Sequence, residues 1–434
     1  MKILVIGGGG REHAIIKALK KNPLCSDITC CPGNGGISYD AACVNIKATD
    51  VKAMVEFAEE QHFDYAVVAQ DDPLALGMVD ALAKIGIPSF GPDAAAARIE
   101  ASKVFSKSLM KKYGIPTADY AVFDDPAKVM DYIRTKNTYP TVIKADGLAL
   151  GKGVLICGSE QEAEEAVKEL MLDKKFGASG NEVVVEEFLE GPEVSVLSFC
   201  DGKTVKPMVS SMDHKRALDH DQGLNTGGMG TIAPNPFYTA EIAERCRKEI
   251  FQPTVDAMAK EGCPFKGCLY FGLMLTKDGP KVIEYNCRFG DPETQVVLPL
   301  LESDLYTIMK ATTDGTLDDT EVRFSDGAAA CVILASGGYP LSYEKGKPIS
   351  GLVNGQIEAD DHVTVYHAGT KIEADGTLVT SGGRVLGVTA TGNTLMDALQ
   401  TAYEASEQIS FEKMFRRSDI GARAIAELNR KKEG

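Results

Sequence analysis

Three polar side chains recur at every second position around residue 286. They are Glu284, Asn286 and Arg288, in the stretch VIEYNCRFGDPET that begins at Val282. Alternate side chains of a β-strand share a face, so a strand here would present these groups together with Val282 and turn Ile283 away. A carboxylate and an amide oxygen suit Mg²⁺, and an arginine suits a phosphate or carboxylate. The spacing alone leaves open a solvated face of exposed charge. We expect GDPET, which follows, to be a turn that aims Arg288.

A second stretch, KADGLALGKGV from Lys144 to Val154, could handle phosphate. A Walker A loop needs Gly-Lys-Ser/Thr and a following helix, but here Gly153 follows Lys152 and the next residues predict a strand. We interpret the pattern strand–glycine loop–strand as a flap over phosphates, with Lys144 pointing its ammonium at them. The alternative is an ordinary hairpin with a solvated lysine. A buried lysine would need a partner.

The N-terminal stretch GGGGREH, from Gly7 to His13, lies between a predicted strand and a predicted helix. It fails the dinucleotide fingerprint Gly-x-Gly-x-x-Gly, because the last position is Glu12 or His13. What remains is a glycine loop at a helix start beside Arg11, which suits a phosphate unless it is a plain tight turn. A second loop, PGNGG at 32–36, follows the next strand. Two such loops at the ends of neighbouring parallel strands predict a small-molecule crevice.

The stretch VVVEEFLEGPE places Glu186 and Glu187 at the end of a valine-rich strand. The backbone N–H and C=O groups of such a strand end can meet a planar base. A surface turn is the alternative.

Alternating strands and helices must position these groups, and they predict an α/β fold of several domains. Residues 1–90 alternate in a way typical of a parallel sheet with helices on both faces. We expect an Ala-rich helix ending near Lys103, a helix starting at Asp125-Pro126, and two strands joined by KDG at 277–279. After about residue 326 we expect a last segment, opened by GAAACVILAS, with hairpin-like stretches around ADGTLVTSGGRVLGVTA and a helix from about Thr394.

Composition narrows the class of protein. The chain has 434 residues, enough for two to four domains, and its 62 acidic against 46 basic residues give a net charge of −16. That charge argues against nucleic acid or a membrane surface as partner. The 11 cysteines include no Cys-x-x-Cys, which favours free thiols in a reducing cytoplasm. The N-terminal apolar run is too short for a signal peptide, and no run is long enough to span a membrane.

The order of the motifs carries a resemblance. IKADGLALGKGV, EEFLEG, NTGGMG (Asn225 to Gly230) and EYNCRFGDPETQ occur in the order found in ATP-grasp enzymes. With GGREHA, PGN, DHKR, HAGT and GGRVLGVTA, the set resembles the phosphoribosylamine–glycine ligase family over essentially the whole chain. The chain departs from the family pattern at Gly8, usually Asn, at Leu224, usually Pro, and at AQDDPL (69–74). These departures touch the ribosylamine pocket.

The resemblance implies a multidomain α/β fold. It implies an N-terminal Rossmann-like domain for phosphoribosylamine at 1–103 and an ATP-grasp domain at 104–326, with a flap-bearing lid subdomain at about 122–193. A mixed α/β domain at 327–434 completes the chain.

The resemblance also implies cofactors and site residues. ATP and Mg²⁺, or Mn²⁺, are the implied cofactors, with Glu284 and Asn286 as metal ligands. The implied ATP contacts, from phosphates through adenine to ribose, are Lys103, Lys144, Gly147, Gly151, Lys152, Gly153, Glu186, Glu187, Leu189 and Glu193. Those for phosphoribosylamine are Gly10, Arg11, Glu12 and Asn34. Asp213 and Arg288 are implied to bind glycine or its phosphate, and Lys144, Arg288 and Asp213 to act in catalysis.

The implied reaction joins glycine to 5-phosphoribosylamine, with ATP cleaved to ADP and phosphate through glycyl phosphate. A monomeric cytoplasmic enzyme acting on these small molecules is expected. The rival interpretations are a nicotinamide oxidoreductase, a non-catalytic nucleotide sensor and an ATP-grasp ligase with another carboxylate or amine. Release of ADP that requires both glycine and phosphoribosylamine would separate them.

Overall fold

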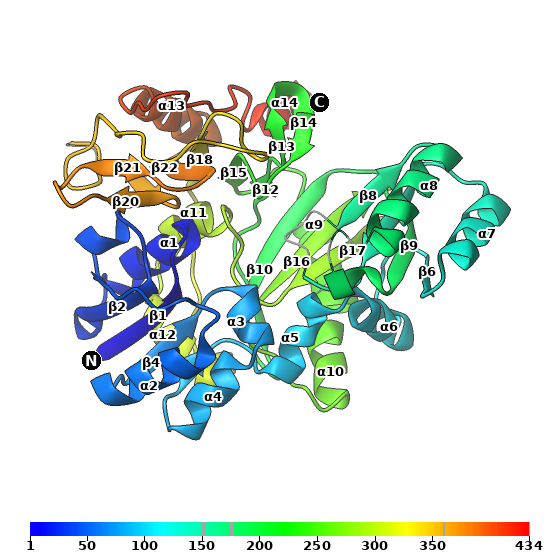
Figure 1. Cartoon of the computed structure of the whole chain (residues 1–434), viewed down its shortest axis with the longest axis horizontal. Coiled ribbons are helices and arrows are strands. Elements are labelled where there is room, and N and C mark those ends of the chain that lie inside the picture. Colours follow the sequence, from blue (N-terminus) through cyan, green and yellow to red (C-terminus); the bar gives the residue numbers. More distant parts are fainter. Residues whose placement is uncertain (149–152, 174, 176, 359–360, 434) are drawn as a thin grey trace.

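Four larger β-sheets organise the part of the chain that the structure describes. This structure is a computed structural model and describes residues 1–148, 153–173, 175, 177–358 and 361–433. Figure 1 shows the N-terminal sheet and the lid sheet at opposite ends of a long central sheet, with the C-terminal sheet packed above the N-terminal one. The predicted multidomain α/β class is confirmed.

The N-terminal sheet is parallel throughout, in the order β3-β2-β1-β4-β5. Its strands are β1 (Lys2–Gly7), β2 (Asp27–Pro32), β3 (Ala42–Cys43), β4 (Tyr65–Val68) and β5 (Ser89–Phe90). Its helices are α1 (Gly10–Leu19), α2 (Val51–Gln61), α3 (Asp71–Ala75), α4 (Met78–Lys84) and α5 (Ala94–Ala101). Asp50 caps α2 by accepting from the N–H of Ala53. The Ala-rich helix ends at Ala101, and Lys103 instead begins α6 (Lys103–Tyr113).

The lid is an antiparallel sheet in the order β6-β9-β7-β8. It contains β6 (Tyr120–Phe123), α7 (Pro126–Lys136), β7 (Thr141–Ala145), β8 (Val154–Cys157), α8 (Glu160–Val167) and β9 (Val183–Glu187). β7 and β8 pair through Lys144 and Val154, so the predicted strand–glycine loop–strand is confirmed. Its core is formed by α7 and α8 packing on the sheet. The lid therefore holds Lys144 in a strand that pairs with the strand after the glycine loop.

The central sheet is antiparallel, in the order β11-β10-β16-β17. It contains β10 (Glu193–Asp201), β11 (Val205–Pro207), β16 (Lys266–Thr276) and β17 (Gly279–Asn286), with α9 (Ala240–Cys246) and α10 (Gln252–Lys260) packed nearby. α11 (Thr294–Val297) and α12 (Leu305–Asp314) follow β17. The predicted pair of strands joined by KDG is therefore confirmed.

A β-bulge at Ile283 corrects the predicted alternation in β17. Glu284 pairs with Gly272, but Val282 pairs with Leu273, so Ile283 has no partner of its own across the ladder. An extra residue of this kind reverses the facing of everything before it. Val282 is accordingly buried in the core, and the prediction that it shares a face with Glu284 is wrong.

The C-terminal sheet has the order β12-β15-β18-β22-β19. It combines β18 (Ala328–Ala335), β19 (Val363–His367) and β22 (Arg384–Gly392) with β12 (Met212–Asp213) and β15 (Gly230–Ala233) from earlier in the chain. The domain boundaries drawn at 103 and 326 stay a prediction, and β12 and β15 show that sheet pairing reaches across the second one. α13 (Leu395–Ser406) starts after Thr394, as predicted, and α14 (Ala422–Glu433) is the last helix described.

Two small hairpins complete the fold. β13 (Arg216–Leu218) pairs with β14 (Gln222–Asn225), and β20 (Thr370–Ile372) pairs with β21 (Leu378–Thr380). β21 is not paired with β22, which lies between β18 and β19. Only the first half of the hairpin-like stretch predicted around residue 380 therefore belongs to a hairpin.

Candidate active site

A cavity of about 1050 Å³ collects most of the predicted site residues. Its walls come from α1, α6, the lid, β10, the β13–β14 hairpin and β17. The predicted residues on its walls are Arg11, Glu12, Lys103, Lys144, Gly147, Gly153, Glu186, Glu187, Leu189, Glu193, Asp213, Glu284, Asn286 and Arg288. Gly10 and Asn34 are not among its lining residues, and Gly151 and Lys152 lie outside the described residues. The cavity is large enough for a nucleotide and small substrates together.

Lys144 lies on the cavity wall at the end of β7 and is only 4% exposed. Its Nζ is 3.0 Å from Oε2 of Glu186 and donates to the carbonyl of Ile283 over 3.3 Å. The partner that a buried lysine requires is therefore Glu186, whose carboxylate is also buried. Nearby, Lys103 donates from Nζ to the carbonyl of Gly147 at 2.8 Å, which ties α6 to the start of the glycine loop. The ammonium groups of Lys103 and Lys144 therefore both lie on the cavity wall, close to the first residues of the glycine loop.

Glu284 and Asn286 line the cavity with side chains that make no hydrogen bond to the rest of the described chain. Burial opposes ionisation of Glu284, but the ammonium groups of Lys215, Lys144 and Lys103 outweigh it and lower the pKa of this carboxyl. Glu284 therefore offers a charged carboxylate and Asn286 an amide oxygen, both without hydrogen-bond partners in the described chain and both on one side of β17. Such a donor set fits Mg²⁺, which takes few protein ligands and completes its shell with water and phosphate. No cluster of three or more His, Cys, Asp or Glu that could hold a metal occurs among the described residues.

Arg288 lies just beyond β17 and lines the same cavity. Its Nη2 is 2.8 Å from Oε1 of Glu100, which is at the end of α5. Nε of Arg288 is buried and has no hydrogen-bond partner among the described residues. Glu100 also accepts from the N–H of Cys287. Its carboxylate therefore binds both the guanidinium of Arg288 and the main chain of the preceding residue. The unused Nε–H leaves a donor for an anionic group.

Asp213 faces a second carboxylate. Burial and the charge of Glu293 raise the pKa of Asp213 well above its ordinary value, against the opposing effect of Lys215 and Arg384. The hydroxyl of Tyr270 donates to Oε1 of Glu293 over 3.1 Å. Asp213 and Glu293 both line the cavity, so their carboxyl groups are available there as hydrogen-bond acceptors. The pair can accept hydrogen bonds from an ammonium or amine.

The carboxylates of Glu12 and Asp291 contact the main chain at the glycine loop before α1. Oε2 of Glu12 accepts from the N–H of Gly9 at 2.6 Å, and Oδ2 of Asp291 accepts from the N–H of Arg11 at 3.4 Å. Arg11 itself pairs with Oε1 of Glu12 at 2.7 Å and donates to the carbonyl of Phe289 at 3.0 Å. The helix start that was predicted for a phosphate is therefore already contacted by acidic side chains. Arg11 and Glu12 still reach the cavity wall.

Asn34 has a structural set of contacts outside the cavity. Its Nδ2 donates to the carbonyls of Gly8 and His367 at 3.1 and 2.7 Å, and its Oδ1 accepts from the N–H groups of Gly36 and Ile37. The side chain therefore joins the two glycine loops to β19. A direct contact with substrate stays a prediction for Asn34 and for Gly10.

Several cavity residues were missed by the sequence reasoning. They are Glu100, Lys107, Lys215, Tyr270, Asp291, Glu293 and Arg384. The segment GDPET was expected to be only a turn that aims Arg288, whereas its Asp291 contacts Arg11 and its Glu293 faces Asp213. Lys215 and Arg384 lie inside the quoted motifs DHKR and GGRVLGVTA. These motifs could have pointed to both residues, but neither residue was given a role. Lys107, by contrast, lies in none of the quoted motifs, and nothing in the sequence around it marks it as a site residue.

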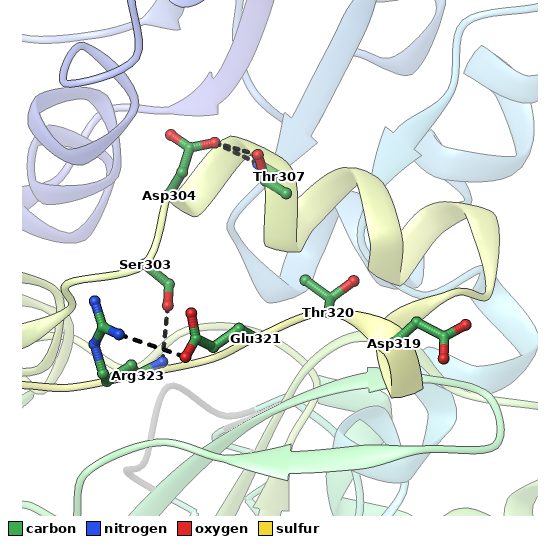
Figure 2. Close-up of a pocket in the computed structure, with 7 residues that line it drawn as sticks. All are labelled: Ser303, Asp304, Thr307, Asp319, Thr320, Glu321 and Arg323. Atoms are coloured by element: carbon green, nitrogen blue, oxygen red, sulfur yellow. Dashed lines mark hydrogen bonds and ion pairs between the residues drawn. The ribbon is translucent and has the colours of Figure 1, made fainter.

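A smaller hollow of about 360 Å³ lies beside α12, and several of its polar groups bind one another. Figure 2 shows Asp304 bound to Thr307, and Arg323 bound to Ser303 and Glu321. Asp304 is the N-cap of α12. None of the predicted site residues lines this hollow, so the candidate functional site is the large cavity.

The fold and the cavity define an ATP-grasp protein, in which Lys144 of the lid, Gly147 and Gly153, and Glu284 of β17 line one cavity. Profiles of phosphoribosylglycinamide synthetase match the chain in three parts: the N domain at 1–100, the ATP-grasp (A) domain at 101–294 and the C domain at 329–423. The chain belongs to the phosphoribosylglycinamide synthetase family.

Relatives and solved structures agree with this assignment. The phosphoribosylamine–glycine ligase of Vibrio vulnificus (strain CMCP6) is 48% identical over 434 residues, covering 99% of this chain and 100% of the relative. A trifunctional purine biosynthetic protein of Gallus gallus is 46% identical, and the match covers 99% of this chain and 43% of that protein. The crystal structure of phosphoribosylamine–glycine ligase from Thermotoga maritima superposes with a TM-score of 0.85 at 35% identity, over 97% of this chain and 100% of that one. A biotin carboxylase domain from Hydrogenobacter thermophilus shares the fold, with a TM-score of 0.73 at 17% identity and coverage of 96% and 91%.

Proposed function

We propose that this protein ligates glycine to 5-phosphoribosylamine, with ATP cleaved to ADP and phosphate, as the names of its relatives indicate for them. The observation that carries the proposal is one cavity in which Lys144, Glu284 and Arg288 converge, in a chain of this family. A carboxylate cannot acylate an amine in water unaided, because its oxygen is a poor leaving group. Transfer of the γ-phosphoryl group to glycine gives glycyl phosphate, which the ribosylamine nitrogen then attacks.

The nucleotide is assigned to the space between the lid and β17. Lys103 and Lys144 provide positive charge for its phosphates, and Gly147 and Gly153 flank them without side chains. Glu186, Glu187 and Leu189 follow one another at the end of β9, where the purine base would lie, and Glu193 is placed for the ribose. Gly151 and Lys152 are proposed to cover the phosphates.

Glu284 and Asn286 are proposed to hold Mg²⁺ or Mn²⁺. When bound, the metal would neutralise charge on the phosphate oxygens and so assist phosphoryl transfer. The protein's own contribution is to keep Glu284 ionised through the nearby lysines and to keep its oxygens free of other hydrogen bonds.

Glycine is assigned to the space between Arg288 and the carboxylate pair. The free Nε–H of Arg288 suits the glycine carboxylate and then the phosphate that forms on it. Asp213 and Glu293 suit the amino group of glycine, because their carboxyl oxygens line the cavity and can accept hydrogen bonds from an ammonium group. Lys144, Arg288 and Asp213 are the residues proposed to act in catalysis, through positioning and charge rather than as nucleophiles.

Phosphoribosylamine is assigned to the side of the cavity formed by Arg11 and Glu12, with Gly10 and Asn34 shaping the loops behind them. Arg11 is held by Glu12 and Phe289, so it would offer its remaining N–H groups in a fixed direction. The proposal extends to a monomeric enzyme in the cytoplasm, where free cysteines stay reduced. All cysteines of this chain are free.

The deciding experiment is ADP release with each substrate alone and with both together. The proposal expects ADP only when ATP, glycine and phosphoribosylamine are all present. ADP with another amino acid and none with glycine would assign a different ligase. Binding of ATP with no turnover in any combination would indicate a nucleotide sensor. No helix among the described residues is long and apolar enough to cross a membrane.

A further inference from the structure

Lys107 is a buried lysine on the cavity wall to which the proposed reaction gives no part. It lies on α6, is 2% exposed, and its Nζ is 3.1 Å from Oε2 of Glu186. The same Nζ donates to Oγ1 of Thr117 at 2.7 Å, and that hydroxyl donates to the carbonyl of Val282 at 2.7 Å. Lys107 is therefore fixed between the lid and β17, beside the bulge at Ile283.

One oxygen of Glu186 serves two ammonium groups. Oε2 is 3.1 Å from Nζ of Lys107 and 3.0 Å from Nζ of Lys144, whereas Oε1 is buried and has no hydrogen-bond partner among the described residues. Two positive charges and one negative charge therefore share a buried site. The excess positive charge suits a nucleotide phosphate, and the spare oxygen suits a donor on the base.

The two lysines differ in what they can reach. Lys144 is at the edge of the glycine loop, where its ammonium is placed for the phosphates. Lys107 has a second partner: it also donates to the hydroxyl of Thr117, which in turn donates to the carbonyl of Val282 in β17. A buried carboxylate that loses its only cation becomes costly. If Glu186 depended on Lys144 alone, turning Lys144 toward a phosphate would leave this carboxylate without a partner.

We propose that Lys107 is a positioning residue for the nucleotide: it anchors Glu186 so that Lys144 is available to the phosphates of ATP. The inference rests on the proposed function for the identity of the nucleotide. It predicts that Lys107 acts on ATP binding and leaves the glycine site unchanged.

The test compares Lys107→Met, Lys107→Arg and the control Lys111→Met. Lys111 is one turn further along α6 and is exposed, and both lysines place Nζ 5.8 Å from the ring centroid of Tyr120. We expect Lys107→Met to raise the KM for ATP at least about tenfold through loss of a charge-assisted contact, and to lower kcat because Lys144 stays bound to Glu186, with the KM for glycine changed by less than about threefold. Lys107→Arg should recover part of the loss, and Lys111→Met should match the wild type. A wild-type KM for ATP in Lys107→Met, or equal losses for all substrates, would overturn the inference.

A double variant keeps the test valid if Lys107→Met does not fold. In Glu186→Gln/Lys107→Met no charged carboxylate is left to anchor, so we expect its affinity for ATP to equal that of Glu186→Gln alone. A further loss in the double variant would contradict the role through Glu186. ATP binding measured by calorimetry, without the other substrates, separates this inference from the proposed function. Weaker ATP binding in Lys107→Met with no ligation by the wild type would sustain the first and refute the second.

Discussion

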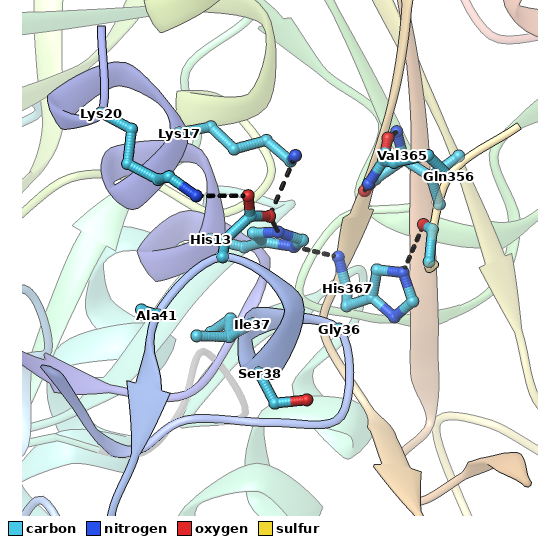
Figure 3. Close-up of polar contacts among 12 residues, drawn as sticks. His13, Lys17, Lys20, Gly36, Ile37, Ser38, Ala41, Gln356, Val365 and His367 are labelled. Atoms are coloured by element: carbon cyan, nitrogen blue, oxygen red, sulfur yellow. Dashed lines mark hydrogen bonds and ion pairs between the residues drawn. The ribbon is translucent and has the colours of Figure 1, made fainter. Parts of the chain in front are cut away.

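The main-chain N–H of His367 donates to Nδ1 of His13 over 2.8 Å and so joins β19 to α1. Because Nδ1 accepts, the ring proton is on Nε2, which lies 2.9 Å from Oδ2 of Asp40. Nζ of Lys17 and Nζ of Lys20 lie 3.0 and 3.1 Å from the oxygens of the same Asp40 carboxylate, and Figure 3 draws both contacts as dashed lines. His13 follows Arg11 and Glu12 directly, so this buried contact fixes the start of α1 against the C-terminal domain.

His367 is itself held on both ring nitrogens. Nε2 lies 2.8 Å from the carbonyl of Gly355, and Nδ1 lies 2.9 Å from Oγ1 of Thr370. Its main-chain carbonyl accepts from Nδ2 of Asn34 at 2.7 Å. The glycine loops of the N-terminal domain and the turn after β19 therefore form one connected network.

Two substitutions at His13 separate the two nitrogens. In His13→Asn the amide oxygen can replace Nδ1 and accept from His367, whereas His13→Gln can replace Nε2 and contact Asp40 but leaves the His367 N–H unpaired. A buried unpaired N–H costs about 1–3 kcal/mol. We expect His13→Gln to be the less stable variant and to show the higher KM for phosphoribosylamine. Thermal unfolding and steady-state kinetics measure both, and a more stable Gln variant would show that the contact to Asp40 contributes more than the contact to His367.

Acid should destabilise the protein through its buried histidines. Burial, with a smaller contribution from Arg417, lowers the pKa of His214 to about 4, and burial with His13 lowers that of His367 to about 3. Burial also lowers the pKa of His13, against Asp40. The unfolded chain therefore binds more protons below its ordinary histidine pKa of about 6.5, so stability is complete above that pH and is lost as pH falls below it.

The pH effect has a clear measurement and a control. Each such histidine contributes a slope of up to about 1.4 kcal/mol per pH unit below pH 6.5. We expect the thermal midpoint to be constant between about pH 7 and 8 and to fall steadily from about pH 6 to 5. In His214→Gln the amide oxygen can still accept from the N–H of Gly421, which now donates to Nε2 at 3.0 Å. This variant should show a shallower fall, and an unchanged midpoint at pH 5 would refute the prediction.

The sequence predicted the parallel N-terminal sheet, the lid hairpin and the β16–β17 pair, because each follows from local periodicity and turn residues. The bulge at Ile283 was missed, since nothing in the alternation of β17 marks an extra residue. Its position depends on the pairing with Gly272 and Leu273, which is a property of two strands together. The side chains after the bulge, Glu284 and Asn286, still share the cavity face as predicted.

Missed site contacts share a cause: their partners are far apart in the chain. Arg11 contacts Asp291 across 280 positions, and Asn34 contacts His367 across 333. Local spacing could show that Arg11 and Asn34 were polar residues in glycine loops, but it could not show which groups they meet. The resemblance supplied residue roles, and only the fold shows that acidic side chains already contact the start of α1.

Removing the carboxylate of Glu284 tests the metal assignment. We expect Glu284→Ala to lower turnover at least about 10²-fold through loss of metal-assisted charge neutralisation. Because the lysines around Glu284 would then be in excess, ATP should still bind. ADP formation over a Mg²⁺ titration measures the effect, with Glu302→Ala, a surface carboxylate paired to Arg323, as control. Near-normal turnover with intact Mg²⁺ dependence would contradict the metal role.

Arg417 is the buried clamp that joins the β13–β14 hairpin to the C-terminal domain. It is 2% exposed and donates from Nε and Nη2 to Asp419 at 2.7 and 2.9 Å, and from Nη1 to Asp221 and to the carbonyl of Arg216 at 3.0 and 3.1 Å. Arg216 and Asp221 line the cavity, so the clamp fixes part of its wall. Removal of one partner of a buried ion pair costs about 3–5 kcal/mol.

We therefore expect Arg417→Met to lower the free energy of unfolding by about 3 kcal/mol and to reduce turnover. Arg417→Lys should recover little, because one ammonium cannot reproduce the forked contacts to two carboxylates and a carbonyl. Arg430→Met is the matched control: Arg430 pairs with Glu427 three residues earlier on α14 and is 74% exposed. That pair is worth about 0.5 kcal/mol or less. Denaturant unfolding of the three variants decides the point, and equal stability of Arg417→Met and Arg430→Met would show that the hairpin is held by other contacts.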